Sequence, residues 1–176
     1  MPSTLESLVA QFDSRNPPPV ELWKPDRVSS IDIHINRQGE WFYRSSKIER
    51  KRMVALFSTI LWREDESWFL VTPQEKLQIT VEVAPFIAEL MEVTGSGESQ
   101  SLSFTDNTGN RFKADDEHSL WISYIDTGQP LPMVIVRRNL PALLCRAVYY
   151  QLAELITEKD SVPGVWSEGV FFRLDG

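Results

Sequence analysis

The sequence predicts an α+β fold of two packed halves that are related by an internal duplication. Short segments in which apolar and polar residues alternate, such as residues 31–36, indicate half-buried strands. Two amphipathic stretches, residues 44–62 and 140–158, carry apolar residues at helical spacing. A strand ending in arginine, a helix, a polar loop and an aromatic strand follow one another twice, which indicates a repeat. We therefore predict an N-terminal half over residues 1–75 and a C-terminal half over residues 76–176.

The N-terminal half begins with a helix predicted over residues 3–12, where apolar residues fall at helical spacing. Consecutive prolines then predict an extended arm over residues 16–25. The alternating segment 31–36 and the segment 40–44 are predicted to form a β-hairpin, because Gln38-Gly39 suits the turn between them.

The first long helix is predicted to run from Ser46 to Trp62. Ser46 as N-cap and Glu49 at the third helical position fit a capping box, in which the two residues satisfy each other's backbone N–H groups. The apolar segment 68–71 after the helix predicts a strand, which Thr72-Pro73 ends. The predicted buried stripe of the helix consists of Met53, Leu56, Phe57, Ile60 and Leu61.

The C-terminal half is predicted to consist mostly of strands, followed by a second long helix over residues 140–158 with Pro141 in its first turn. A turn over residues 164–169 and a final strand over residues 170–174 follow. Residues 106–110 have the composition of a hairpin turn. The predicted strands of this half are residues 76–83, 86–93, 102–104, 111–113, 120–125 and 133–137.

The duplication is predicted from an alignment that places Ile48 on Leu140, so that the two long helices coincide. Each predicted helix is preceded by arginine, Arg44 in the first half and Arg137-Arg138 in the second. Each is followed by a polar loop and an aromatic strand. The alternative explanation is a chance similarity between two amphipathic helices.

The composition argues against several functional classes. The formal net charge of −7 and an isoelectric point near 4.9 argue against general nucleic-acid binding, which needs a basic surface. The single cysteine, Cys145, excludes an intramolecular disulfide, and His34 and His118, the two histidines, exclude a His-rich metal site. The sequence has no signal-peptide pattern and no apolar run of the roughly 20 residues that a membrane span needs. We expect a cytoplasmic protein that uses no metal or cofactor, and we find no catalytic motif.

Positive charge is concentrated where the first long helix is predicted to begin. The cations of this stretch, set against Glu49 alone, are Arg44, Lys47, Arg50, Lys51 and Arg52. A helix N-terminus already carries partial positive charge, so these cations disfavour the helix unless an anion binds there. Backbone N–H groups and cations together suit a phosphate. The alternative is a solvated face that pairs with the acidic surface. Arg137 and Arg138 repeat the arrangement before the second predicted helix.

Aromatic residues and the junction of the halves supply further candidates. Trp41 and Trp166 offer flat rings on which a base could stack, and the alternative is that they are core or anchor residues. Thr72 and Lys76 lie at the predicted junction, where Lys76 either pairs with Glu75 or reaches a ligand.

A family resemblance covers nearly the whole chain from about Pro18. The segments that carry it are residues 20–23, 31–33, 39–43, 48–50, 56–61, 69–76, 81–86, 147–150 and 164–172. Through these segments the chain resembles the uncharacterised bacterial family catalogued as domain of unknown function 1285. It departs from the family pattern at Ser29-Ser30, where Cys-Gly is usual, and at Ser46-Lys47, where Ser-Pro is usual.

The resemblance implies a two-domain α+β fold with a duplicated core and no established activity. It implies that the C-terminal half loosely resembles pleckstrin-homology-like barrels that are capped by a helix. It also implies a ligand site between the halves, suited to a nucleotide-like molecule in signalling.

Our first functional hypothesis is therefore a non-enzymatic regulatory binding protein with an anionic, nucleotide-like ligand between the halves. The alternative is a protein–protein adaptor in which the sheet edge near residues 120–125 binds a partner strand. A third hypothesis is a phosphate-ester hydrolase that uses Asp32 and His34, which share the polar face of one predicted strand. The candidate ligand-binding residues are Arg44, Lys47, Arg50, Trp41, Asp32, Thr72, Lys76, Arg137, Arg138 and Trp166.

Overall fold

The computed structural model describes residues 17–176, so the helix predicted over residues 3–12 lies outside the described residues. The chain divides into two compact units, Met1–Pro85 and Phe86–Gly176. The boundary lies beyond the predicted one after residue 75, because the strand that begins at Glu75 pairs within the first unit. Both units combine sheets with few helices, which confirms the predicted α+β class.

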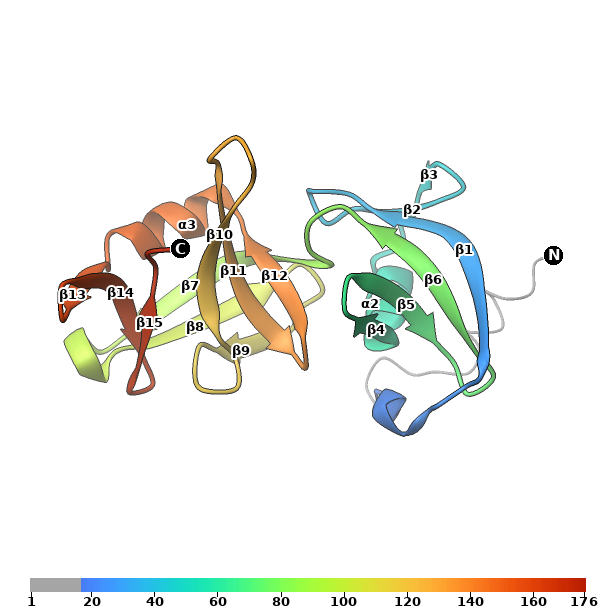
Figure 1. The fold of residues 1–176 in the computed structure, drawn as a ribbon, viewed down its shortest axis with the longest axis horizontal. Helices are drawn as coiled ribbons and strands as arrows, with labels where there is room; N and C mark the ends of the chain where they lie inside the picture. The colour runs from blue at the N-terminus through green and yellow to red at the C-terminus, as the bar shows by residue number, and fades with distance from the viewer. Residues whose placement is uncertain (1–16) are drawn as a thin grey trace. The chain divides into compact units, whose positions relative to one another are not determined.

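The N-terminal unit is built on a six-stranded sheet with the order β3-β2-β1-β6-β5-β4 (Figure 1). Its strands are β1 (Arg27–Ile35), β2 (Trp41–Tyr43), β3 (Ser46–Lys47), β4 (Leu61–Glu64), β5 (Ser67–Val71) and β6 (Glu75–Val81). Two antiparallel three-stranded runs, β1–β3 and β4–β6, meet where β1 and β6 pair in parallel. A short 3₁₀ helix, η1 (Val20–Leu22), precedes the sheet, and α2 (Lys51–Thr59) connects β3 to β4.

The first helix is shorter than predicted, and the capping-box prediction at Ser46 is wrong. Ser46 and Lys47 form β3, which pairs with β2 after a tight turn at Arg44 and Ser45. Both turn residues have positive φ, 48° and 65°, as a two-residue hairpin turn requires. The N-cap of α2 is therefore Arg50, and no side chain caps the helix. Ser46 and Lys47, which the sequence pattern places in the first helical turn, are therefore part of a β-strand.

The core of the N-terminal unit follows the alternation of its strands. Ile33 and Ile35 point inward from β1 and are at most 1% exposed. Phe57 is fully buried on the inner face of α2, and its ring stacks on that of Trp41 at a centroid distance of 6.2 Å. Burying a side chain of this size contributes about 1.5–3 kcal/mol. Packing of this kind holds α2 against the sheet.

The C-terminal unit contains a six-stranded sheet with the order β10-β11-β12-β7-β8-β9 and a three-stranded sheet with the order β13-β14-β15 (Figure 1). The strands of the first are β7 (Phe86–Thr94), β8 (Ser101–Asp106), β9 (Arg111–Lys113), β10 (Leu120–Tyr124), β11 (Pro130–Arg137) and β12 (Leu140–Leu144). Those of the second are β13 (Thr157–Lys159), β14 (Val162–Ser167) and β15 (Val170–Arg173). The helix α3 (Arg146–Ala153) packs on β7, and the 3₁₀ helix η2 (Gly97–Ser99) connects β7 to β8.

The two six-stranded sheets have the same connectivity, which supports the duplication. In each, two antiparallel three-stranded runs are joined by parallel pairing of the first and sixth strands, β1 with β6 and β7 with β12. The helices do not follow the predicted repeat. α2 lies between the third and fourth strands of its unit, whereas α3 follows the sixth. The duplicated unit is therefore the sheet, and the helix-on-helix alignment is wrong.

The second long helix is also shorter than predicted. Residues 140–144 form β12, which lies between β11 and β7 in the sheet. A strand that has neighbours on both sides and is covered on both faces has a continuous apolar sequence. The periodicity of such a sequence alone does not distinguish the strand from a buried helix. The predicted turn over residues 164–169 is largely β14, and the chain turns only at Glu168 and Gly169.

A buried serine joins the three-stranded sheet to β8. The Ser167 hydroxyl donates to the carbonyl of Ala114 at 2.7 Å and accepts from the backbone N–H of Leu102 at 3.0 Å. Ser167 is fully buried, so an alanine there would leave the Leu102 N–H without its acceptor. We expect Ser167→Ala to lower the free energy of unfolding by about 1–3 kcal/mol. Urea denaturation measures this, with the exposed Ser119→Ala as the matched control. Equal values for both variants would contradict the prediction.

Candidate functional site

A cavity of about 370 Å³ opens on the N-terminal unit. Small-molecule sites have volumes of roughly 300–1,000 Å³, so this cavity is large enough for a small ligand. Its lining residues are Asp32, His34, Asn36, Phe42, Ser45 and Glu82.

Within residues 17–176, neither α2 nor α3 is long and apolar enough to cross a bilayer.

Strand geometry positions one side of this cavity. Because Ile33 and Ile35 point into the core, the alternating residues Asp32 and His34 on β1 face outward. His34 pairs directly with Phe42 of β2, and the two rings are 6.1 Å apart. The register between β1 and β6 shifts between Ser30 and His34, so the pairing is irregular beside Asp32.

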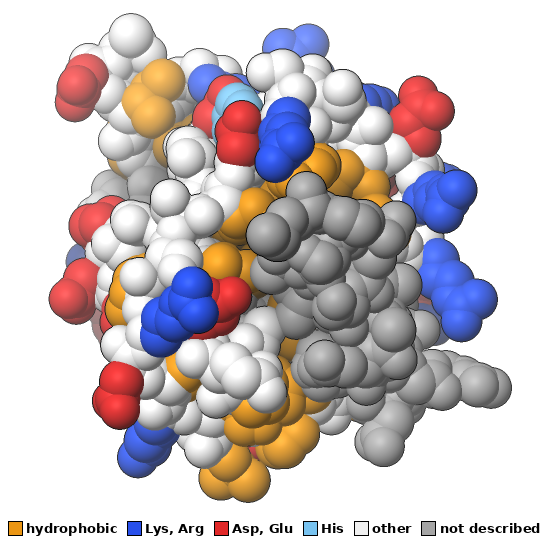
Figure 2. Space-filling view, turned by 90° about the vertical axis from the view of Figure 1, so that its right-hand side faces the viewer, with side chains coloured by type: hydrophobic (Ala, Val, Ile, Leu, Met, Phe, Trp, Pro, Cys, Tyr) orange, Lys and Arg blue, Asp and Glu red, His pale blue; other side chains and the backbone are white. Residues whose placement is uncertain are grey.

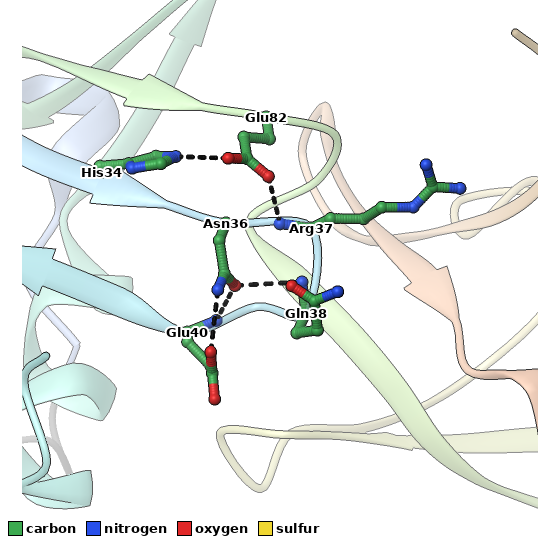
Figure 3. Close-up of polar contacts among 6 residues, drawn as sticks. All are labelled: His34, Asn36, Arg37, Gln38, Glu40 and Glu82. Carbon is green, nitrogen blue, oxygen red and sulfur yellow. Dashed lines mark hydrogen bonds and ion pairs between the residues drawn. The ribbon is translucent and has the colours of Figure 1, made fainter.

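Glu82, the residue that follows β6, also lines the cavity. One carboxylate oxygen lies 2.9 Å from His34 Nε2, and the other accepts from the backbone N–H of Arg37 at 2.7 Å. Figure 3 shows the His34 and Glu82 side chains pointing toward each other, while the Arg37 side chain extends away from them. Since an ionised carboxylate only accepts, the hydrogen of the first contact belongs to His34 Nε2. The two bonds fix the orientation of both side chains.

The turn between β1 and β2 is held by Asn36 (Figure 3). Its Oδ1 accepts from the backbone N–H groups of Gln38 and Glu40 at 3.0 and 2.9 Å, and its Nδ2 donates to Glu40 at 2.8 Å. Lys47 donates to the other Glu40 oxygen at 2.8 Å. The Lys47 ammonium and then Asn36 hold the pKa of Glu40 below its usual value, and Glu40 raises the pKa of Lys47. Lys47 is thus engaged in holding the turn.

Two polar side chains of the cavity remain available to a ligand. The carboxylate of Asp32 makes no hydrogen bond or ion pair with any residue in the described range 17–176, although its backbone oxygen accepts from Arg44 N–H at 3.0 Å. The Ser45 hydroxyl likewise has no hydrogen-bond partner in that range. Groups at the surface that have no protein partner exchange water for a ligand at little cost.

The residues of the range 17–176 that line the cavity do not form the donor set of a metal centre. Among the described residues no three His, Cys, Asp or Glu side chains are grouped so that they could hold a metal ion. Asp32, His34 and Glu82 therefore share a cavity without forming a coordination shell. What the arrangement offers a ligand is hydrogen bonding, negative charge and one aromatic wall.

The basic residues predicted to bind an anion lie in separate structural elements. Arg44 occupies the β2–β3 turn, where its guanidinium lies 5.1 Å from the centre of the Tyr43 ring. Arg50 is the N-cap of α2. Neither of them, nor Lys47, lines the cavity. On the face drawn in Figure 2, acidic side chains border a histidine and basic side chains gather along the right-hand margin.

Arg137 and Arg138 do not precede a helix, so the predicted second basic helix start is wrong. Arg137 ends β11, and Arg138 has a φ of 51° in the turn to β12. The Arg137 guanidinium lies 5.2 Å from the centre of the Phe86 ring, and burial lowers the pKa of Arg137. Its guanidinium is therefore packed over a core ring of the C-terminal unit.

The two candidate tryptophans differ in exposure. Trp41 is 1% exposed and stacks on Phe57, so it has no ring face at the surface and the prediction that it offers one is wrong. Trp166 is half-buried in β14. The Lys159 ammonium lies 4.9 Å from the centre of its ring, and the Phe171 ring lies 5.2 Å away.

Thr72 and Lys76 hold the β5–β6 turn. Thr72 is buried, and its hydroxyl oxygen accepts from the backbone N–H groups of Gln74 and Glu75 at 3.2 and 3.1 Å. Lys76 pairs with Glu64 at 2.8 Å, which lowers the pKa of the Glu64 carboxyl. Glu75 forms an ion pair with Arg27 instead, so the predicted Glu75–Lys76 pair is wrong. Both residues lie within the N-terminal unit rather than at its boundary.

Most residues of the cavity were not predicted from the sequence. Glu82 lies 48 positions from His34 along the chain, and no sequence pattern links the two. The signal for Phe42 was available, because the register of the β1–β2 hairpin places it opposite His34. Ser45 lies in the stretch 44–62, whose spacing predicts a helix, whereas it belongs to a hairpin turn.

Two units with the same six-stranded connectivity define a two-domain α+β protein. The first unit has a ligand-sized cavity. The chain belongs to the DUF1285 family. The model of "Domain of unknown function (DUF1285), N-terminal domain" matches residues 18–84, and that of "Protein of unknown function (DUF1285), C-terminal domain" matches residues 85–174. The boundary between these two domains agrees to within one residue with that between the two compact units.

Solved structures of the same family are similar to this chain. A DUF1285 family protein from Silicibacter pomeroyi DSS-3 is 41% identical, with a TM-score of 0.91 over 98% of this chain and 94% of that one. A DUF1285 family protein from Shewanella baltica OS155 is 26% identical, with a TM-score of 0.54 over 69% of this chain and 90% of that one. No functionally curated protein matches the chain.

Proposed function

We propose that this chain is a cytoplasmic, non-enzymatic binding protein with a regulatory role in signalling, and that a small polar molecule occupies the cavity of its N-terminal unit. The observation that carries the proposal is the cavity itself. It combines one aromatic wall, a fixed His34–Glu82 pair and two polar groups, Asp32 and Ser45, that are not engaged by described residues. Ligand sites typically combine an apolar surface with a few convergent polar groups in this way.

Binding is favoured over hydrolysis by the contacts of His34. An enzyme with a serine nucleophile needs a base within hydrogen-bond reach of the hydroxyl. The described contact of His34 Nε2 goes to Glu82, and neither Asp32 nor Ser45 is bonded to the imidazole in the range 17–176. Glu82 and His34 therefore suit recognition, in which fixed orientation is what matters.

An anionic, nucleotide-like ligand at the start of α2 is the second candidate. The specific observation in its favour is that the first turn of α2 contains no acidic residue and no side-chain cap. Arg50, Lys51 and Arg52 are exposed there. An anion would complement both these cations and the backbone N–H groups of the first turn.

For the C-terminal unit we propose a barrel-like sheet capped by α3, loosely of the pleckstrin-homology-like type. The antiparallel runs β7–β9 and β10–β12, and the packing of α3 on β7, support this proposal. In an adaptor role, β10 would receive a partner strand, because it is the end strand of its sheet and carries the exposed Tyr124.

The test of the proposed function is a compound panel followed by thermal denaturation. The panel contains amines, polyols, carboxylates and nucleotides, and compounds that raise the Tm of the wild type are measured by calorimetry. We expect Phe42→Ala to weaken the binding of such a compound about tenfold, because an aromatic wall of this kind contributes about 1–2 kcal/mol. Tyr43→Ala, which changes the neighbouring aromatic residue outside the cavity, is the control and should change Kd less than about twofold.

Two results would contradict the proposed function. One is that no compound of the panel raises the Tm of the wild type. The other is that Phe42→Ala and Tyr43→Ala weaken binding equally although both variants keep the far-UV circular dichroism of the wild type.

A further inference from the structure

We propose that the ligand of the N-terminal cavity carries a protonated amine. This inference rests on the proposed function, since it names the chemical class that the same cavity selects. Among residues 17–176, two carboxylates, Asp32 and Glu82, line the cavity, and no lysine or arginine side chain of this range lines it. A cation entering the cavity therefore meets negative charge without displacing an internal ammonium or guanidinium.

The acceptors of the cavity suit an ammonium group. Asp32 accepts no hydrogen bond at its carboxylate from any described residue, so all of its lone pairs can receive N–H donors. Each Glu82 oxygen accepts one bond, from His34 or from Arg37 N–H, and keeps a second acceptor position (Figure 3). The Ser45 hydroxyl adds a further acceptor. A primary ammonium has three donors to share among these groups.

The aromatic wall formed by Phe42 is a second reason to expect a positively charged ligand. Phe42 lies opposite His34 in the β1–β2 hairpin, and both side chains line the cavity. The face of a phenyl ring attracts a cation, and the attraction is stronger when the cation is partly desolvated. The same ring gives an apolar surface to the carbon chain or ring of an amine. The expected ligand is thus an amine attached to an apolar group.

Other ligand charges fit less well. A phosphate or carboxylate would face both carboxylates at short range, where like charges repel. A divalent metal ion would need more converging donors than the described residues group together. A neutral alcohol could use the same acceptors but would leave the negative charge of Asp32 uncompensated. The matched comparison is therefore an amine against its alcohol and its carboxylate.

The experiment uses three probes of nearly equal shape: phenethylamine, 2-phenylethanol and 3-phenylpropionate. Each is titrated into the full chain, and binding is followed by backbone amide chemical shifts of residues 32–45 and by calorimetry. We expect phenethylamine to bind at least about tenfold more tightly than either other probe. Asp32→Asn should remove about a tenfold factor, because it keeps the shape and deletes the charge. Asp26→Asn, an exposed aspartate of the same unit outside the cavity, should leave the affinity unchanged.

The outcomes separate this inference from the proposed function. Equal or tighter binding of the alcohol or the carboxylate at the cavity amides overturns the amine inference and leaves the cavity as a ligand site. The inference also fails if Asp32→Asn and Asp26→Asn behave alike. If none of the three probes binds, the amine inference is wrong. The proposed function is then decided by the wider panel, in which Phe42→Ala must weaken the binding of a compound.

Discussion

Replacing Gly164 with alanine is expected to disrupt the three-stranded sheet of the C-terminal unit. Gly164 lies in the middle of β14 and pairs with Arg173 of β15. A Cβ atom at this position would lie 2.3 Å from the backbone oxygen of Phe172 and 2.6 Å from the ring of Phe171. A backbone oxygen in a strand cannot rotate away, so β15 would have to move as a whole. We expect a loss of about 3 kcal/mol, the upper end of the cost of overpacking.

Hydrogen exchange detects this effect where it arises. Because a chain of two units need not unfold in one step, a local measurement is preferable to a single global midpoint. The backbone amides of β14 and β15 should exchange much faster in Gly164→Ala than in the wild type. Gly169→Ala is the control, since a Cβ there meets nothing within 4 Å and only its φ of 76° disfavours alanine. We expect that variant to lose about 1 kcal/mol.

The same substitution bears on a residue that sequence analysis selected as a ligand platform. Trp166 lies on β14 beside the Phe171 ring, and Lys159 covers both rings. Gly164 provides the space in which the Phe171 ring lies against the sheet. A loss of Gly164 therefore also releases Trp166 from its neighbours. If Gly169→Ala were to accelerate exchange as much as Gly164→Ala does, the steric argument for this arrangement would be wrong.

Local patterns predicted the strands better than the helices. Alternation over residues 31–36 and the apolar segment 68–71 correspond to parts of β1 and β5. The predicted segments 102–104 and 111–113 are parts of β8 and β9. The second long helix was overestimated because β12 is a strand buried between two neighbours, whose apolar run resembles a helix. The first was overestimated because Ser46 and Lys47 pair with β2 as β3. Alternation is a local property, whereas burial on both faces depends on the whole sheet.

The candidate site was predictable only in part, for the same reason. The alternation of β1 places Asp32 and His34 on its polar side, and both line the cavity. Glu82 reaches His34 through the parallel pairing of β1 with β6, and a parallel pair leaves no turn signal in the sequence. The cations of residues 44–52 are close in sequence, which predicts a single cluster. Because the chain turns at Arg44 and Ser45, these cations lie in three different elements: a turn, the strand β3 and the helix α2.

Trp41→Ala is expected to cost about 3–5 kcal/mol of folding free energy, because it empties a large space in the core of the N-terminal unit. Trp41 is 1% exposed and packs on Phe57, which is fully buried. Its indole Nε1 is buried and donates to no acceptor among the described residues. Trp41→Phe therefore loses no hydrogen bond and removes a buried donor that is not satisfied, which is favourable. It keeps most of the ring, so we expect a cost of only about 1 kcal/mol.

The two Trp41 variants distinguish a core residue from a ligand platform. Urea denaturation, followed by hydrogen exchange in β1 and β2, gives the stability of each variant. A ligand-stacking role predicts that Trp41→Phe loses affinity for compounds that bind the cavity while stability changes little. The core role predicts that affinity stays within about twofold of the wild type, because Trp41 does not line the cavity. Nearly equal stability losses for Trp41→Ala and Trp41→Phe would contradict the packing argument, since only the larger truncation leaves most of the ring's volume empty.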